Sequence, residues 1–244
     1  QSAQAGMALN ALAEKDAKIA ELTAINTLLL YAEKTGCKLH ICHMSIPEGA
    51  ELIARARRNG VDVTVETCSH YLTLNYQDQA QLGTFAMINP PLRSRERMER
   101  LWDYVLDGTI DYLGTDHAPY LLSDKLPPDG DLRKAACGAP EIDVAIPLLL
   151  EEGVRNRNMP LGRFAAFTAT NAAKRFGFYP RKGVLAVGSD AGLYLGPGQR
   201  GIPGWADPSG AWLRTYDPSS VGEDPIRKQW AALGPVSRGA AHCL

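Results

Sequence analysis

The chain has 244 residues, of which 45% are hydrophobic, and its formal net charge is −1 at pH 7. The apolar fraction supplies the core of one large domain or two small ones and predicts a globular protein. Charged residues of both signs are spread along the chain, so no basic patch for nucleic acid or for an anionic membrane stands out. We therefore expect a small, neutral or weakly charged molecule as the partner, with no nucleic acid and no membrane.

The cysteine pattern bears on the cellular compartment. The five cysteines are odd in number and include no Cys-x-x-Cys pair. This argues against a disulfide framework and against a structural zinc knuckle, so we expect reduced thiols and a cytoplasmic protein. No apolar run approaches the roughly 20 residues of a membrane span, and no basic-then-apolar signal pattern precedes the first predicted helix.

The first predicted element is a helix over residues 11–35, where apolar residues recur at spacings of three and four. Its inner face is predicted to consist of Ile19, Leu22, Ile25, Leu28, Leu29 and Ala32. Gly36 is expected to end this helix, because glycine tolerates the left-handed conformation of a helix end. A short strand is predicted over residues 38–43, where polar and apolar residues alternate.

The next segment carries a helix-start signal. Ser45 and Glu48 have the spacing of a capping box, and Pro47 stands in the first turn. The pattern predicts a helix that runs to Arg58, followed by a strand over residues 61–65.

A third unit follows the same plan. Ser94 is expected to cap a helix that Gly108 stops, and a strand over residues 110–114 comes next. The inner face of that helix is predicted to be Met98, Leu101, Trp102 and Val105. Later helices are predicted over residues 140–150, 161–167 and 171–176. Pro147 is expected to kink the first of them.

Strands separated by helices predict a parallel sheet with right-handed crossovers. His43 follows the first predicted strand, the polar run 66–70 follows the second, and Asp116 and His117 follow the third. Because the carboxyl ends of parallel strands meet at one edge, these groups should gather there. The sequence therefore predicts a functional site at that edge.

The chemistry of these residues leaves alternatives open. Asp116 at the mouth of a barrel is suited to bind a divalent metal and to accept a proton from metal-bound water, beside imidazole nitrogens. His43 taken alone is equally consistent with a packed core histidine. His117 is consistent with a substrate contact, with a group that steadies Asp116, or with a solvated turn. Asn89, next to two prolines, is consistent with ligand contact or with simple turn chemistry.

Five short motifs, taken in chain order, carry a resemblance. They are HICHMS at 40–45, VETCSHYL at 65–72, NPPLR at 89–93, GTID at 108–111 and TDHAP at 115–119. In this order they resemble the carboxyl-terminal half of the cyclic amidohydrolases, which include dihydroorotase, allantoinase, dihydropyrimidinase and hydantoinase. The similarity covers roughly residues 20 to 190.

The resemblance implies a fold and a reaction. Members of this family are metal-dependent (β/α)8 barrels of the TIM type with a small β-domain. They hydrolyse a cyclic amide C–N bond with metal-activated hydroxide at a binuclear zinc centre. The fold class implied here is α/β, with about three barrel strands and their helices. Residues 1–180 are expected to form this partial barrel, and 181–244 a remnant of the small β-domain with a divergent Gly/Pro-rich tail.

The resemblance also implies roles for individual residues. His43 and Asp116 are implied as metal ligands, and Asp116 as the catalytic proton carrier. The implied substrate contacts are His117, Asn89, Gly138, Ala139 and Pro140. Glu66 and His70 fall in the motif of the seventh strand, where structural support and catalysis are both consistent with the pattern.

The remaining ligands of the family would lie upstream of residue 20: a His-x-His pair, a carboxylated lysine and a further histidine. We therefore expect at most a partial zinc site, and a sheet whose exposed edges favour a homo-oligomer or association with a complete barrel. The alternative is a non-catalytic truncated homologue or pseudoenzyme that acts as an assembly partner. The sequence does not identify the cyclic substrate, although residues 69–70 and 118–119 favour dihydroorotase or an uncharacterised relative over hydantoinase.

Overall fold

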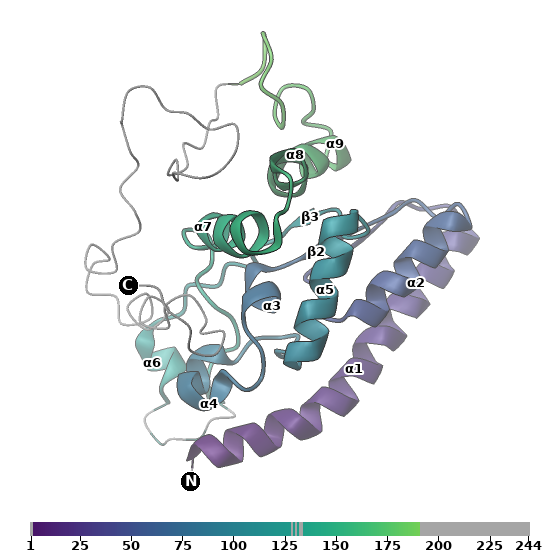
Figure 1. Ribbon diagram of the computed structural model, residues 1–244. Coiled ribbons are helices and arrows are strands. Elements are labelled where there is room, and N and C mark those ends of the chain that lie inside the picture. Colours follow the sequence, from purple (N-terminus) through teal and green to yellow (C-terminus); the bar gives the residue numbers. More distant parts are fainter. Residues whose placement is uncertain (1, 128, 130, 132–133, 191–244) are drawn as a thin grey trace, which may run out of the picture. The chain divides into compact units, whose positions relative to one another are not determined.

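The computed structural model describes residues 2–127, 129, 131 and 134–190 (Figure 1). The described residues up to Ser189 form one compact unit. The tail predicted after residue 190 lies outside the described residues, so the small β-domain remnant and its boundary at residue 181 stay predictions.

Three parallel strands form the sheet, in the order β1-β2-β3. They are β1 (Leu39–Ile41), β2 (Val63–Thr67) and β3 (Tyr112–Leu113). Each pairs with the next in parallel, with Leu39 opposite Val63 and Glu66 opposite Tyr112. The predicted parallel α/β sheet is confirmed, and all three strands point their carboxyl ends to the same edge.

Helices α2 (Pro47–Arg58) and α5 (Arg95–Asp107) connect the strands and pack against each other. The predicted inner face of α5 is confirmed, because Met98, Leu101, Trp102 and Val105 are all buried. Its predicted ends are also confirmed. The Ser94 hydroxyl accepts a hydrogen bond from the Arg97 N–H at 3.4 Å, and Gly108 adopts a φ of 93° at the last turn.

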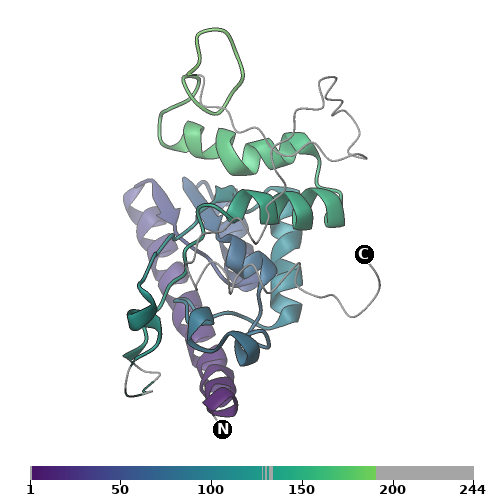
Figure 2. The same cartoon turned by 90° about the vertical axis from the view of Figure 1, so that its left-hand side faces the viewer.

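Helix α1 (Ser2–Thr35) lies along α2 and ends at Gly36, whose φ is 69° (Figures 1 and 2). Only part of its predicted inner face is correct. Ile25, Leu29 and Ala32 are buried, but Ile19 and Leu28 are 64% and 44% exposed. The buried stripe is narrower than the apolar pattern, because α1 covers its neighbours along one line of side chains rather than over a broad face.

The predicted capping box before α2 is wrong. Helix α2 does begin at Pro47, but no side chain caps it. Ser45 instead hydrogen-bonds to Glu21 of α1, through its N–H at 2.8 Å and its hydroxyl at 2.6 Å. A carboxylate brought in by tertiary packing accepts these protons, and a hydrogen bond to a charged group is stronger than one to the helix backbone.

Arg93 completes a buried polar cluster with these two residues. Its Nε donates to the Ser45 hydroxyl at 2.9 Å, and a guanidinium nitrogen lies 2.7 Å from a Glu21 carboxylate oxygen. The side chains of Arg93 and Glu21 are only 2% and 11% exposed. The cluster joins α1, the segment after β1 and the segment before α5, so it fixes the helix layer to the end of the first strand.

Short elements fill the remaining described residues. They are α3 (Ser69–Thr73), α4 (Gln79–Leu82), η1 (Gly83–Ala86), α6 (Leu122–Lys125), α7 (Ala145–Leu149), η3 (Leu150–Arg155), α8 (Leu161–Ala165), η4 (Ala166–Thr170) and α9 (Asn171–Arg175). The stretch α7–η3 lies beside α8–η4–α9 (Figures 1 and 2). In the part of the chain that the structure describes, no helix is both long and apolar enough to cross a membrane.

The helix predicted over residues 140–150 begins later, at Ala145. Pro147 therefore lies in the first turn, where its missing N–H interrupts no helical hydrogen bond. The expected kink at this proline gives way to an irregularity further along, where η3 is wound as a π-helix.

Replacing Arg93 with alanine tests the buried cluster. The substitution leaves the Glu21 carboxylate buried without its cation, and we expect the free energy of unfolding to fall by about 3 kcal/mol. Urea denaturation followed by circular dichroism measures this change. The control is Arg100→Ala, which removes a solvent-exposed pair with Glu51 at 2.9 Å and should cost about 0.5 kcal/mol. Equal losses in both variants would contradict the structural role of the cluster.

Candidate functional site

His43 and Asp116 stand directly beyond the carboxyl ends of β1 and β3, as predicted. Both adopt left-handed backbone conformations, with φ of 38° and 45°. Residues other than glycine rarely occupy this region, and such strain concentrates at functional sites. His43 is half-buried and Asp116 is exposed. The backbone turns at both positions are thus held by their surroundings rather than by local preference.

The negative charge of Asp116 contributes to raising the pKa values of two neighbouring thiols, Cys42 and Cys68. Burial raises the pKa of Cys42, and the negative charges of Glu66 and Asp116 raise it further. Burial likewise raises the pKa of the Cys68 thiol, with smaller contributions from acidic groups that include Asp116. The strand ends are joined by backbone hydrogen bonds, from the Met44 N–H to the Glu66 carbonyl at 2.9 Å and from the Gly114 N–H to the Thr67 carbonyl at 3.0 Å. The structure therefore gathers the three strand ends as the sequence predicted.

His43 and Asp116 fit a metal by the chemistry of their donor atoms. The Nδ1 atom of His43 is buried and has no hydrogen-bond partner among the described residues. Buried polar atoms normally have a hydrogen-bond partner, so a buried nitrogen without one is consistent with a bound metal ion. Imidazole nitrogen and carboxylate oxygen are both ordinary zinc ligands. Two protein ligands form only part of such a site.

His117 is held by backbone groups on the far side of its ring. Its Nδ1 atom accepts hydrogen bonds from the N–H groups of Glu141 and Ile142, at 3.0 and 3.2 Å. These donors need the lone pair of Nδ1, so the proton of the neutral ring resides on Nε2. His117 therefore offers an N–H donor, which suits the predicted contact with a substrate oxygen.

The predicted substrate loops contact one another. His117 forms a β-bridge with Ala139, and the Ala118 N–H donates to the Ala139 carbonyl at 2.9 Å. Gly138 adopts a φ of 141°, and a Cβ there would lie 2.6 Å from the Ala118 Cβ, so only glycine permits this approach. The structure thus places Gly138 and Ala139 against the segment that carries Asp116.

Asn89 and Pro140 complete the predicted contacts. Asn89 is exposed, and its loop is joined to the Gly138 loop by a hydrogen bond from the Gly138 N–H to the Met87 carbonyl at 2.8 Å. The Tyr71 hydroxyl donates to the Pro90 carbonyl at 2.6 Å and holds the other side of the Asn89 loop. Pro140 is buried. The roles assigned to all these residues stay predictions.

His70 lies in the core of the protein. His70 is almost fully buried, and its Nδ1 lies 3.0 Å from one carboxylate oxygen of Glu141, while the Ser69 hydroxyl donates to the other oxygen. Glu141 thus joins α3 to the backbone that holds His117. His70 supports the site from behind and does not reach its surface, which favours the structural interpretation of this residue.

Lys125 is a site-supporting residue that sequence analysis missed. Its side chain is 1% exposed, and the ammonium donates to the carbonyls of Thr84, Met87 and Ala136 at 2.9 to 3.3 Å. It therefore ties the Asn89 loop to the Gly138 loop. Burial lowers the pKa of Lys125 from 10.5 to about 8. A single lysine in a polar stretch gives no sequence signal for such a position.

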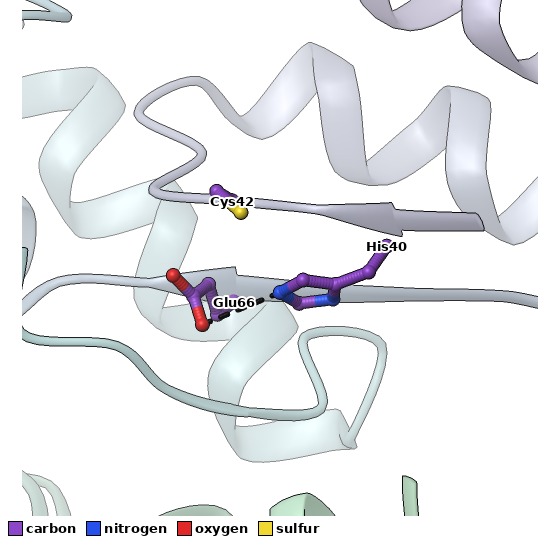
Figure 3. A group of neighbouring side chains, drawn as sticks. All are labelled: His40, Cys42 and Glu66. Atoms are coloured by element: carbon purple, nitrogen blue, oxygen red, sulfur yellow. Dashed lines mark ion pairs between the residues drawn. The ribbon is translucent and has the colours of Figure 1, made fainter. Parts of the chain in front are cut away.

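A second group that sequence analysis missed lies on the sheet itself. His40 and Cys42 on and beside β1, together with Glu66 on β2, bring three ligand atoms within 4.8 Å of one another (Figure 3). His40 and Cys42 are two residues apart along an extended segment, and residues at that spacing share a face. The sequence alternation could therefore have predicted that His40 and Cys42 share a face. It could not have predicted that Glu66 lies opposite them, because the strand register is not evident in the sequence.

Comparisons with known proteins settle the ancestry of this arrangement. A sequence model of the amidohydrolase family matches residues 8–196. The chain belongs to the amidohydrolase family. It is 42% identical over 181 residues to an allantoinase of Rubrobacter xylanophilus, and 39% identical over 175 residues to an L-hydantoinase of Paenarthrobacter aurescens. Each alignment covers 72% of this chain but only 38% of the relative.

Solved structures support the same family. An L-hydantoinase (dihydropyrimidinase) from Arthrobacter aurescens superposes with a TM-score of 0.68 at 36% identity, covering 74% of this amidohydrolase chain and 44% of that one. A D-hydantoinase (dihydropyrimidinase) from a Thermus species gives a TM-score of 0.65 at 30% identity, covering 68% and 37% of the two chains. The predicted fold class, part of a TIM-type barrel, is confirmed. The chain spans less than half the length of these relatives.

The titration of Lys125 gives a test of the loop contacts. Its pKa is lower in the folded state, so between about pH 8 and 10.5 the unfolded chain binds more protons and the free energy of unfolding should rise with pH. Below about pH 8 this contribution is constant. We expect Lys125→Met to remove that rise.

Urea denaturation of both proteins across this pH range measures the effect, and the difference between them cancels the other groups that titrate there. The matched control is Lys34→Met, which removes an exposed lysine of α1. An identical pH slope in the wild type and in Lys125→Met would contradict a buried, perturbed lysine.

Proposed function

We propose that this chain contributes to hydrolysis of the C–N bond of a cyclic amide, with allantoin and hydantoin rings as the substrate class. One observation carries the proposal: the segment with Asp116 and His117 contacts the loop of Gly138 and Ala139 at the carboxyl edge of the sheet. The named activities of the allantoinase and hydantoinase relatives supply the choice of ring. The chain covers 38% of the length of those relatives.

The residues take distinct roles in this proposal. His43 and Asp116 would hold zinc, which supplies Lewis acidity and lowers the pKa of water when it is bound. Asp116 takes up at its carboxylate the proton of the water that attacks the ring carbonyl carbon, and delivers it to the ring nitrogen as the C–N bond breaks. The Nε2–H of His117 donates to a ring carbonyl oxygen, and the Asn89 and Gly138 loops orient the ring between them.

The second candidate is a non-catalytic assembly role, and the surface of α1 favours it. Leu28, Leu30 and Tyr31 are 44%, 50% and 61% exposed on one turn of that helix, and Ile19 is 64% exposed further back. Large apolar side chains exposed on a helix are available for contact with a partner. A second copy of this chain or a complete barrel of the same family would cover them.

Substitution of Asp116 by asparagine separates the two candidates. For a catalytic chain, the loss of the proton carrier should lower kcat by a factor of at least about 100 on the best ring substrate. The measurement is amide-ring opening by the zinc-supplemented chain with allantoin, a 5-substituted hydantoin, dihydrouracil and dihydroorotate. Dihydroorotate is included because residues 69–70 and 118–119 resemble those of dihydroorotase.

Asp103→Asn is the matched control, since this residue is exposed on α5. Its activity should equal that of the wild type. Turnover that survives in Asp116→Asn would contradict the catalytic proposal. A chain that sediments as a dimer and opens no ring, with or without zinc, would support the assembly role instead.

A further inference from the structure

The register of the sheet brings the side chains of His40, Cys42 and Glu66 together. His40 pairs with Thr64 across β1 and β2, so continuing that register places Cys42 beside Glu66. Figure 3 shows the imidazole and the carboxylate facing one another between the two strands, with the cysteine on the same segment as the histidine. These contacts follow from strand pairing and do not depend on a mobile loop.

The distances suit a metal ion. His40 Nε2 lies 3.3 Å from a Glu66 carboxylate oxygen, and the three ligand atoms lie within 4.8 Å of one another. Ligand atoms around one tetrahedral zinc are roughly 3.5 Å apart, given bond lengths of about 2.0 to 2.3 Å. The histidine and the glutamate already have this separation, and the thiol needs a movement on the order of 1 Å to join them.

The far side of the His40 ring is fixed as in metal-binding histidines. Its Nδ1 lies 2.9 Å from the Tyr112 hydroxyl and 3.1 Å from the Thr64 hydroxyl, and the ring stacks on Tyr112. An Nδ1–H donated to these oxygens leaves the lone pair of Nε2 directed toward Glu66. Such second-sphere hydrogen bonds orient the ring and raise the basicity of the ligand nitrogen.

The surroundings also provide room and access. A Cβ at residue 114 would overlap the Glu66 carboxylate, so Gly114 leaves the space that this side chain occupies. His40 and Glu66 are each 19% exposed, and Cys42 is exposed, so an ion can reach the group from solvent. A thiolate with an imidazole and a carboxylate favours zinc-like transition metals over magnesium or calcium.

We propose that His40, Cys42 and Glu66 form a binding site for a zinc-class divalent metal across β1 and β2, separate from the His43 and Asp116 pair. One thiolate and one carboxylate balance the charge of the ion, and a fourth coordination position stays open to solvent or to a ligand. The ion joins β1 to β2 and therefore stabilises the register on which the rest of the site depends.

Cobalt titration of the metal-stripped 244-residue chain tests this site. We expect a near-ultraviolet thiolate-to-cobalt charge-transfer band, which Cys42→Ser abolishes and Cys37→Ser leaves unchanged. Cys37 is the matched control because it is exposed and free and lies just before β1. Glu66→Gln should weaken cobalt binding at least tenfold, in line with the loss of one of three ligands. Zinc should raise the Tm of the wild type by more than that of Cys42→Ser, which keeps only the His43 and Asp116 pair.

The same titration distinguishes this site from the proposed hydrolytic one. His43→Ala should keep the thiolate band and lose ring hydrolysis, whereas loss of the band alone would leave the hydrolytic proposal standing. The inference is overturned if the wild type gives no band, or if Cys42→Ser keeps it. Circular dichroism of each variant shows whether it is folded. If Cys42→Ser fails to fold, Cys42→Ala replaces it in the same comparison.

Discussion

The parallel alignment of β1, β2 and β3 is the constraint on which the rest of the structure depends. It is fixed at the start of β3 by Asp111, whose carboxylate accepts from the Val65 N–H at 2.7 Å and pairs with Arg57. Arg57 in turn donates to the Val63 carbonyl at 2.9 Å and to the Thr109 carbonyl at 2.7 Å. A slip of one residue would reverse every side chain of the shifted strand, so this half-buried ion pair helps to determine which groups reach the site.

Local signals in the sequence predicted the layout well where a single turn of chain decides the structure. Ser94 and Gly108 ended α5 as expected, since capping and a left-handed C-terminal turn involve near neighbours only. Ser45 failed for the opposite reason. Its partner, Glu21, is 24 residues away and arrives only when α1 packs against the sheet. No pattern around Ser45 contains that information.

The residues of the candidate site also divide into those placed by local sequence and those placed by contacts between distant segments. His43 and Asp116 were predictable, because a polar residue directly after a buried strand of a parallel sheet falls at the carboxyl edge. Lys125 and Glu141 were not, since Lys125 donates to backbone carbonyls, and the Glu141 N–H to the His117 ring, in segments that are distant in the sequence. His40 and Cys42 lie between these cases. Their spacing of two was visible, but Glu66 joins them only through the register of β2.

The proposed partial zinc site of His43 and Asp116 depends on this strand register. Anomalous scattering at the zinc edge, from crystals of the zinc-soaked chain, tests it most directly. We predict a peak within about 2.0 to 2.2 Å of a His43 ring nitrogen and an Asp116 carboxylate oxygen. Zinc peaks found only elsewhere, with none between these two side chains, would contradict the account.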